Sequence, residues 1–518
     1  MRIRIVGLAA LLALATAGCT GDPNDPLTWA KKVKDLREQK EALDHLANMD
    51  VERARPAVPY LIELYKSSKK PEHLEALARF KDPETKPLML EALDYSDDDF
   101  DRAVVAAGVL GEMKAVDAVD PLIKAVEKPL PIKSRANSVR VAAIRSLVKI
   151  GDKRAVEPLG KILTTSADEQ DFLLNQKAAL ALAELRDPAG IPALIKGLFM
   201  TGRGINVFQE CRLALVRLGD PSVQPLINLL DDQNPEIRAM AKQLKFDENS
   251  PGVVVTKASI VLGDLRAKKA VPRLIAHLGI PQKGGEHTAI AIALGYIGTP
   301  QAVDSLIAIL KNPKAAPPLR ASAADGLYLS GDKRAVSTLM DIAKSGYVTA
   351  PNGKKASDLR ANAAIDLARI GGREHFDAFK ALADKESEAQ GPFGEALDRL
   401  QVAKECGGNL ACYGKILNDP SWPRAEKAAF AIGFSGDKKG IPLLLAAMKP
   451  VASIQPERFP VHMAILYSLT RLGSKSCTDC EERLLKQIER DEKAVRIPGA
   501  RDLLAETRVA LAVIQNKS

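Results

Sequence analysis

A block of about 36 residues recurs from Asp101 toward the C-terminus, and this repeat constrains the fold more than any other feature of the sequence. In one clear copy, residues 140–159, apolar side chains recur at helical spacing and the pattern stops at Gly151-Asp152. Glycine permits the backbone that ends a helix, and aspartate can accept hydrogen bonds from the start of the next one. Each block is therefore predicted to be a pair of helices.

The glycine at the end of the first helix can be followed from block to block. It is found at Gly111, Gly151, Gly219, Gly263, Gly298, Gly331, Gly371, Gly436 and Gly473, with Arg186 and Cys406 standing in at two positions. One hairpin cannot bury its own apolar stripe, so the hairpins must stack on their neighbours. Aromatic residues make up only 4% of the chain, which favours closely packed helices over sheets. We predict an all-α fold, an α-solenoid of about thirteen hairpins arranged as an extended, curved rod.

After the glycine, the blocks continue with aspartate, a small residue followed by a branched one such as Ala155-Val156, and often a proline such as Pro158 or Pro192. This pattern resembles HEAT repeats, in the short form first noted in phycobilisome lyases, over residues 101–488. The resemblance implies that the second helices of the hairpins line the concave face of the solenoid.

The N-terminus is predicted to direct export. A short basic start is followed by an apolar run that is too short to span a membrane as a mature helix. Residues 15–19, which end at Cys19, resemble a bacterial lipoprotein signal, so Cys19 is expected to carry the lipid and to become the mature N-terminus. Thr20, where aspartate would retain the protein at the inner membrane, implies the outer membrane. The alternative is secretion without a lipid anchor.

These features divide the chain into five segments. We expect a lipoprotein signal peptide at 1–18, a polar tether at 19–28, degenerate helical repeats at 29–100, the HEAT-repeat array at 101–490, and a C-terminal capping helix at 491–518.

The charge balance is mildly basic. Loss of Arg2 and Arg4 with the signal peptide lowers the formal net charge from +9 to +7. This permits contact with anionic lipids, polymers or acidic proteins, but it gives little support to nucleic-acid binding in an exported protein.

On the predicted second helices, lysine recurs at the position that follows the Leu-Ile pair. Lys124, Lys161 and Lys196 occupy it in three successive blocks. They are candidates for a basic ridge that holds an acidic segment or an anionic polymer. The alternative is that these lysines only solvate an exposed helical face.

The remaining cysteines comprise Cys211 in a helical run and two local pairs. The pairs, Cys406 with Cys412 and Cys477 with Cys480, each fall in the turn of a hairpin. In an oxidising envelope we predict a disulfide in each turn. The alternative for Cys477 and Cys480 is a redox role, because a thiolate is stabilised near a helix start.

No constellation of catalytic residues stands out. The six histidines are scattered, and the sequence contains no zincin or Walker motif. We therefore predict no catalytic residue, no metal ligand and no cofactor.

The sequence thus favours a non-enzymatic, lipid-anchored scaffold that binds an envelope protein or an anionic polymer on its concave face. Two alternatives stay open. One is a bilin-lyase-like or other cofactor-handling HEAT-repeat protein, and the other is a thiol-disulfide protein that uses Cys477 and Cys480.

Overall fold

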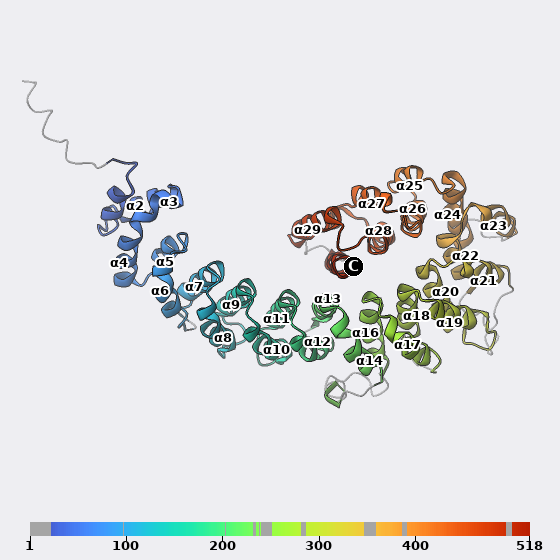
Figure 1. Ribbon diagram of the computed structural model, residues 1–518, viewed down its shortest axis with the longest axis horizontal. Helices are drawn as coiled ribbons and strands as arrows, with labels where there is room; N and C mark the ends of the chain where they lie inside the picture. Colours follow the sequence, from blue (N-terminus) through green and yellow to red (C-terminus); the bar gives the residue numbers. More distant parts are fainter. Residues whose placement is uncertain are drawn as a thin grey trace, which may run out of the picture. The chain divides into compact units, whose positions relative to one another are not determined.

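The protein is an α-solenoid of stacked helical hairpins in the computed structural model (Figure 1). The structure describes residues 22–96, 98–202, 204–231, 235–237, 239, 251–280, 286–345, 359–385, 391–493 and 500–517. The predicted signal peptide and Cys19 lie outside these residues. Two compact units can be distinguished: unit 1 ends at Ala181, and unit 2 begins at Leu182.

Unit 1 consists of helical hairpins joined by short 3₁₀ turns. Its α-helices are α1 (Pro26–Lys32), α2 (Gln39–Asn48), α3 (Val51–Ala54), α4 (Val58–Ser68), α5 (Pro71–Ala78), α6 (Lys86–Ala92), α7 (Asp101–Glu112), α8 (Val119–Glu127), α9 (Asn137–Ile150), α10 (Val156–Thr164) and the first part of α11 (Phe172–Leu185). Its 3₁₀ helices are η1 (Arg55–Ala57), η2 (Pro83–Thr85), η3 (Val116–Ala118) and η4 (Lys153–Ala155).

Unit 2 continues with the same kind of hairpin from the last residues of α11. Its other α-helices are α12 (Ile191–Gly197), α13 (Phe208–Leu218), α14 (Val223–Leu230), α16 (Pro251–Asp264), α17 (Val271–Leu278), α18 (Glu286–Ile297), α19 (Pro300–Lys311), α20 (Pro317–Ser330), α21 (Arg334–Lys344), α22 (Leu359–Ile370), α23 (Phe376–Ala383), α24 (Pro392–Cys406), α25 (Leu410–Ile416), α26 (Trp422–Phe434), α27 (Ile441–Ala447), α28 (Phe459–Leu472), α29 (Thr478–Glu492) and α30 (Ala500–Asn516).

Short elements complete unit 2. The 3₁₀ helices are η5 (Pro188–Gly190), η6 (Asp220–Ser222), η7 (Lys268–Ala270), η8 (Arg373–His375), η9 (Lys438–Gly440), η10 (Val451–Ser453) and η11 (Pro456–Arg458), and the strands are β1 (Thr201–Gly202) and β2 (Ile205–Asn206). The two strands pair antiparallel, with Thr201 opposite Asn206.

The hairpin turn follows the chemistry expected from the sequence. Helix α9 ends at Gly151, which has a φ of +76° that L-residues rarely adopt. The side chain of Asp152 then accepts a hydrogen bond from the backbone N–H of Arg154, and this bond caps η4, which leads directly into α10. The local sequence therefore determines where the first helix stops and where the second begins.

Two of the repeated glycines do not end a helix as predicted. Gly111 and Gly263 lie within α7 and α16, and the left-handed residues that follow these helices are Lys114 and Arg266. A Cβ at Gly111 would lie 2.8 Å from Cα of Ser146 on α9. These glycines are required because neighbouring first helices cross too closely for a side chain.

The predicted tether is too long. Helix α1 begins at Pro26, and Asp25 caps it by accepting a hydrogen bond from the N–H of Leu27. Trp29 and Ala30 are buried, so the folded part of the chain starts before residue 29.

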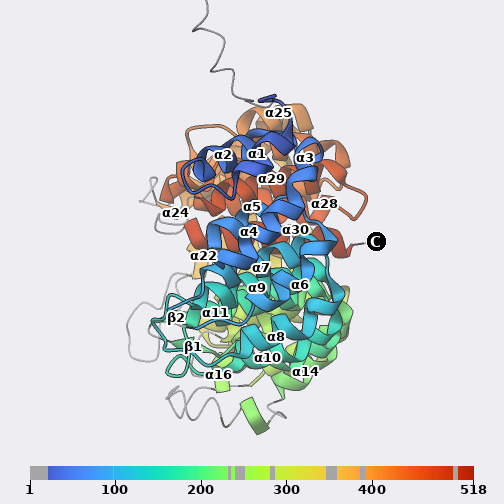
Figure 2. The same cartoon turned by 90° about the vertical axis from the view of Figure 1, so that its left-hand side faces the viewer.

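The prediction of an extended rod is wrong for unit 2. Helix α30 packs against α28 and α29, which precede it, and also against α13 near the start of the unit. Figures 1 and 2 show α28, α29 and α30 side by side. At the contact with α13, Asn516 donates a hydrogen bond to the carbonyl of Val216. The C-terminal helix therefore closes unit 2 on itself instead of capping a free end.

Candidate functional site

The three predicted basic residues lie on second helices, but they differ in exposure and in the residues that surround them. Lys124 on α8 and Lys161 on α10 are exposed in unit 1, where α8 and α10 are neighbours. Lys161 pairs with Glu157 on its own helix at 3.3 Å. Lys196 belongs to α12 in unit 2 and is half-buried, with its Nζ 2.5 Å from Glu236.

Lys124 borders a groove between α6 and α8. The groove has a volume of about 550 Å³. Its walls include Leu90 of α6, Leu93 directly after α6 and Pro121 of α8. Lys124 and Lys128 contribute cations to it, and Asp94 and Glu127 contribute carboxylates. This groove therefore combines an apolar wall with charges of both signs on the second-helix side of unit 1, and Lys124 is its exposed cation.

Tyr95 also lines this groove, and several contacts fix its position. Its hydroxyl donates a 2.9 Å hydrogen bond to the carbonyl of Ala125, and the ammonium of Lys128 lies 4.5 Å from the centre of its ring. Lys128 also donates to the carbonyl of Tyr95 and lies 3.9 Å from Asp94. Burial raises the pKa of Tyr95 to about 12, so its hydroxyl stays protonated. Lys128 is thus engaged within the protein, whereas Lys124 extends to solvent at the edge of the groove.

The expectation that second helices line the concave face is wrong for unit 2. The first helices of this unit face its interior, and the second helices lie on the outer side (Figure 1). Tyr296 of α18 stacks on Tyr467 of α28 with ring centres 5.4 Å apart, and Arg471 donates a 3.2 Å hydrogen bond to the carbonyl of Ser330. Because these side chains meet across the interior, the outer helices are the ones that face away from it.

No sequence motif pointed to the arginine and tyrosine side chains that pack together in the interior of unit 2. Arg266 lies 4.4 Å from the ring centre of Tyr296 and donates to the hydroxyl of Thr470, and Arg369 lies 4.4 Å from the ring centre of Tyr328. Burial raises the pKa of both tyrosines well above the ordinary value. These residues come from helices far apart in the sequence, and no local motif joins them.

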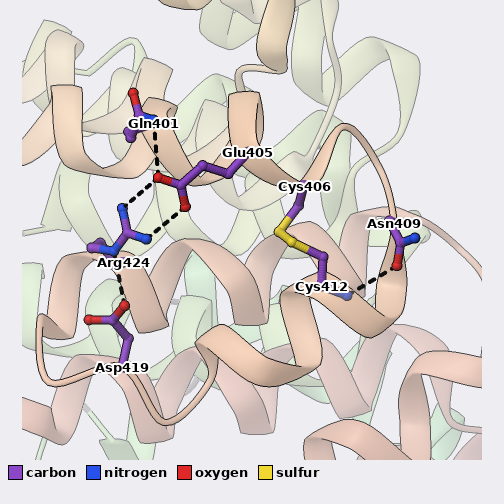
Figure 3. Close-up of a disulfide and its surroundings, with 7 residues drawn as sticks. All are labelled: Gln401, Glu405, Cys406, Asn409, Cys412, Asp419 and Arg424. Atoms are coloured by element: carbon purple, nitrogen blue, oxygen red, sulfur yellow. Dashed lines mark hydrogen bonds and ion pairs between the residues drawn. A yellow bond between two sulfur atoms is a disulfide. The ribbon is translucent and has the colours of Figure 1, made fainter.

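Cys406 and Cys412 form a disulfide in the structure, with Cα atoms 5.4 Å apart (Figure 3). Although the sequence placed Cys406 in the glycine position, the left-handed residue is the next one, Gly407, with a φ of +53°. The side chain of Asn409 accepts a 3.0 Å hydrogen bond from the N–H of Cys412 and caps α25. The disulfide and this cap together fix the turn between α24 and α25.

An ion pair lies beside this disulfide. Arg424 of α26 is 2.8 Å from Glu405 and 3.0 Å from Asp419, as Figure 3 shows. The hydrogen bond from Arg424 lowers the pKa of Glu405. The arrangement ties α24 to α26.

Cys477 and Cys480 also form a disulfide, with Cα atoms 5.2 Å apart. Cys477 is the N-cap residue of α29, and its Sγ accepts a hydrogen bond from the N–H of Cys480. Cys480 is fully buried in the apolar core. Cys211 is a buried free thiol whose pKa burial raises well above the ordinary value, which keeps it protonated.

Two properties of the described residues bear on metal binding and on membrane crossing. Among them, no group of three or more His, Cys, Asp or Glu side chains is placed to hold a metal ion. No helix within this part of the chain has the length and apolarity needed to cross a membrane.

Family models match two segments of the sequence. Residues 132–203 match HEAT repeats, and residues 288–312 match the PBS lyase HEAT-like repeat. These matches support a HEAT-repeat protein. No curated protein matches the sequence.

Solved structures that resemble this chain are helical solenoids of distant sequence. The complex of CpcE and CpcF of phycocyanin lyase from Nostoc sp. PCC7120 is 22% identical, with a TM-score of 0.25, over 55% of this chain and 94% of that one. The karyopherin Kap121p bound to the extreme C-terminus of the protein phosphatase Cdc14p is 11% identical, with a TM-score of 0.39, over 94% of this chain and 54% of that one. The chain thus spans about half of the karyopherin. At these identities the likeness concerns the fold alone.

Proposed function

We propose that this HEAT-repeat protein is a lipid-anchored, non-enzymatic scaffold of the bacterial outer membrane, which holds an acidic segment of an envelope protein against the second-helix side of unit 1. The groove beside Lys124 is the observation that carries this proposal. The export signal and the lipidation motif at Cys19 supply the location.

The groove suits an extended segment that carries both apolar and acidic residues. Its apolar wall, which includes Leu90 and Leu93, can bury side chains of the partner, while Lys124 at the edge can pair with a carboxylate. Lys161, on the neighbouring helix, pairs with Glu157, and both side chains are more than half exposed. Such an exposed pair contributes little to stability, so a partner carboxylate can replace Glu157 at low cost.

Charge reversal tests the site. In cells, Lys124→Glu combined with Lys161→Glu is expected to abolish most of the crosslinking between the protein and its partner, because two attractive contacts become repulsive. The matched control reverses two exposed lysines of unit 2, Lys438→Glu with Lys439→Glu, and should leave the crosslinked product unchanged. If the first variant kept its helicity and still retained the partner, the groove would not be the binding site.

The anchor is tested separately. With Cys19→Ala, the protein should move from the membrane fraction to the soluble envelope fraction and should no longer incorporate labelled palmitate, because the acyl chains supply the membrane affinity. Unchanged membrane association and labelling would contradict lipidation at Cys19, whatever the outcome at the groove.

A further inference from the structure

Unit 2 contains a cavity at the outer ends of two hairpins near the C-terminus. It has a volume of about 260 Å³ and lies between the ends of α25 and α27 and the first half of α28, with residues of η10 and η11 at its border. Leu417, Val461 and Ile465 give it an apolar wall. Its volume lies just below the roughly 300 to 1,000 Å³ of small-molecule sites, and its mixed apolar and polar lining is typical of them.

His462 of α28 is the unusual residue of this cavity. It is among the residues that line the cavity, it is only 3% exposed, and its buried Nε2 has no hydrogen-bond partner among the described residues. Buried polar atoms nearly always have a partner, because an unpaired one loses its hydration without compensation. The unpaired ring nitrogen of a residue that lines a cavity is therefore a candidate contact for a group bound there.

Burial also determines the state of this imidazole. It lowers the pKa of His462 to about 4. At neutral pH the ring is uncharged, with one nitrogen that donates a hydrogen bond and one that accepts. His462 can thus donate from Nε2 to an oxygen of a ligand without adding a buried charge.

The charged residues of the cavity are all cationic. Arg458 lines it and is held in place by donating to the carbonyls of Asp419 at 2.8 Å and Leu417 at 3.4 Å. Lys449 lies exposed at the border, and no carboxylate is part of the lining. The electrostatic field of these two side chains favours an anion.

We propose that this cavity binds a small amphipathic carboxylic acid, whose carboxylate accepts a hydrogen bond from His462 near Arg458 and Lys449, and whose aliphatic part packs on Val461 and Ile465. This site is distinct from the groove in unit 1 and does not depend on the scaffold function.

The experiment uses the full mature chain with Cys19→Ala and with ¹³C-labelled histidine. Hexanoate is the probe, and hexan-1-ol and hexylamine are its neutral and cationic counterparts. Hexanoate should shift the ring resonance of His462 saturably, and the absence of that resonance in His462→Leu assigns it. By calorimetry, hexanoate should bind at least tenfold more tightly than hexylamine, with hexan-1-ol between them.

Variants separate the contributions of the ring and of the charge. His462→Leu should weaken hexanoate binding at least tenfold without lowering the melting temperature, and His462→Gln serves as the second variant if the leucine variant does not fold. Lys449→Gln should weaken the binding of hexanoate severalfold and leave that of hexan-1-ol unchanged, whereas the matched exposed control Lys438→Gln should change neither. An unmoved His462 resonance at saturating hexanoate, equal or tighter binding of hexylamine, or undiminished hexanoate binding by His462→Leu would overturn the proposal.

Discussion

Several buried charged side chains in unit 2 are matched by opposite charges or by backbone carbonyls. Arg212 of α13 is 2.6 Å from Asp264 and 2.5 Å from Glu506. Lys427 of α26 instead donates to the carbonyl of Gly371 at 2.6 Å. Because a charge left unpaired in the interior is costly, these contacts determine which helices can pack together.

Removal of Arg212 tests this view. Arg212→Met leaves Asp264 buried without its partner, and we expect the free energy of unfolding of unit 2 to fall by about 3 to 5 kcal/mol. The chain contains two tryptophans, one in each unit, so in a Trp29→Phe background the fluorescence of Trp422 reports urea unfolding of unit 2 alone.

Lys269→Met provides the matched control. Lys269 pairs with Asp220 at 3.4 Å on the surface, where both side chains are at least 70% exposed. Such pairs contribute about 0 to 1 kcal/mol. Equal losses of unfolding free energy in the two variants would show that the buried ion pairs of Arg212 stabilise unit 2 no more than a surface pair does.

His462 predicts a pH dependence of stability. Its folded-state pKa of about 4 lies below the ordinary value of 6.5, so between these values the unfolded state binds more protons than the folded state. Stability is therefore lost as the pH falls from 6.5 to 4, by up to about 3 kcal/mol from this residue. Urea unfolding at pH 7 and pH 4.5 should show a smaller pH-dependent loss for His462→Leu than for the wild type. Parallel losses in both proteins would contradict the prediction.

At the level of the hairpin, the turn between two helices is stabilised by residues close in sequence. Asp152 caps one turn, and the disulfide between Cys406 and Cys412 closes another over a sequence separation of 6 residues. This is why the positions of the turns could be predicted from the sequence. The glycines within helices could not be distinguished from those at turns, because Gly111 serves a contact with Ser146 on a different hairpin.

The cysteine pairing gives a direct test at this level. In the mature Cys19→Ala protein, iodoacetamide should label no cysteine while the protein is folded and should label only Cys211 after denaturation without reductant. Reduction before labelling should make all five cysteines reactive, which mass spectrometry can count. Labelling of Cys477 in the denatured, unreduced protein would show that its pair is not an oxidised structural disulfide.

At the level of unit 2, closure depends on the contact between α30 and α13. Val513 of α30 is 5% exposed and borders the same cavity as Val216 of α13, whereas Leu485 of α29 is 47% exposed. Val513→Glu places a charge beside α13, so amide hydrogen exchange in α13 should increase. The same change at Leu485 should leave α13 as protected as in the wild type. Unchanged protection of α13 in Val513→Glu would show that the two helices do not depend on each other.

The sequence by itself determined the all-α solenoid and the positions of most turns, because helical periodicity, capping residues and local cysteine pairs act over a few residues. Closure of unit 2 was decided by the tertiary structure, since Arg212 and Glu506 lie 294 residues apart. Small rotations between successive hairpins add up to the path of the solenoid. The sequence of one repeat does not reveal this accumulated rotation. For the same reason, which helix face is available to a partner, and the cavity beside His462, became visible only once the hairpins were stacked.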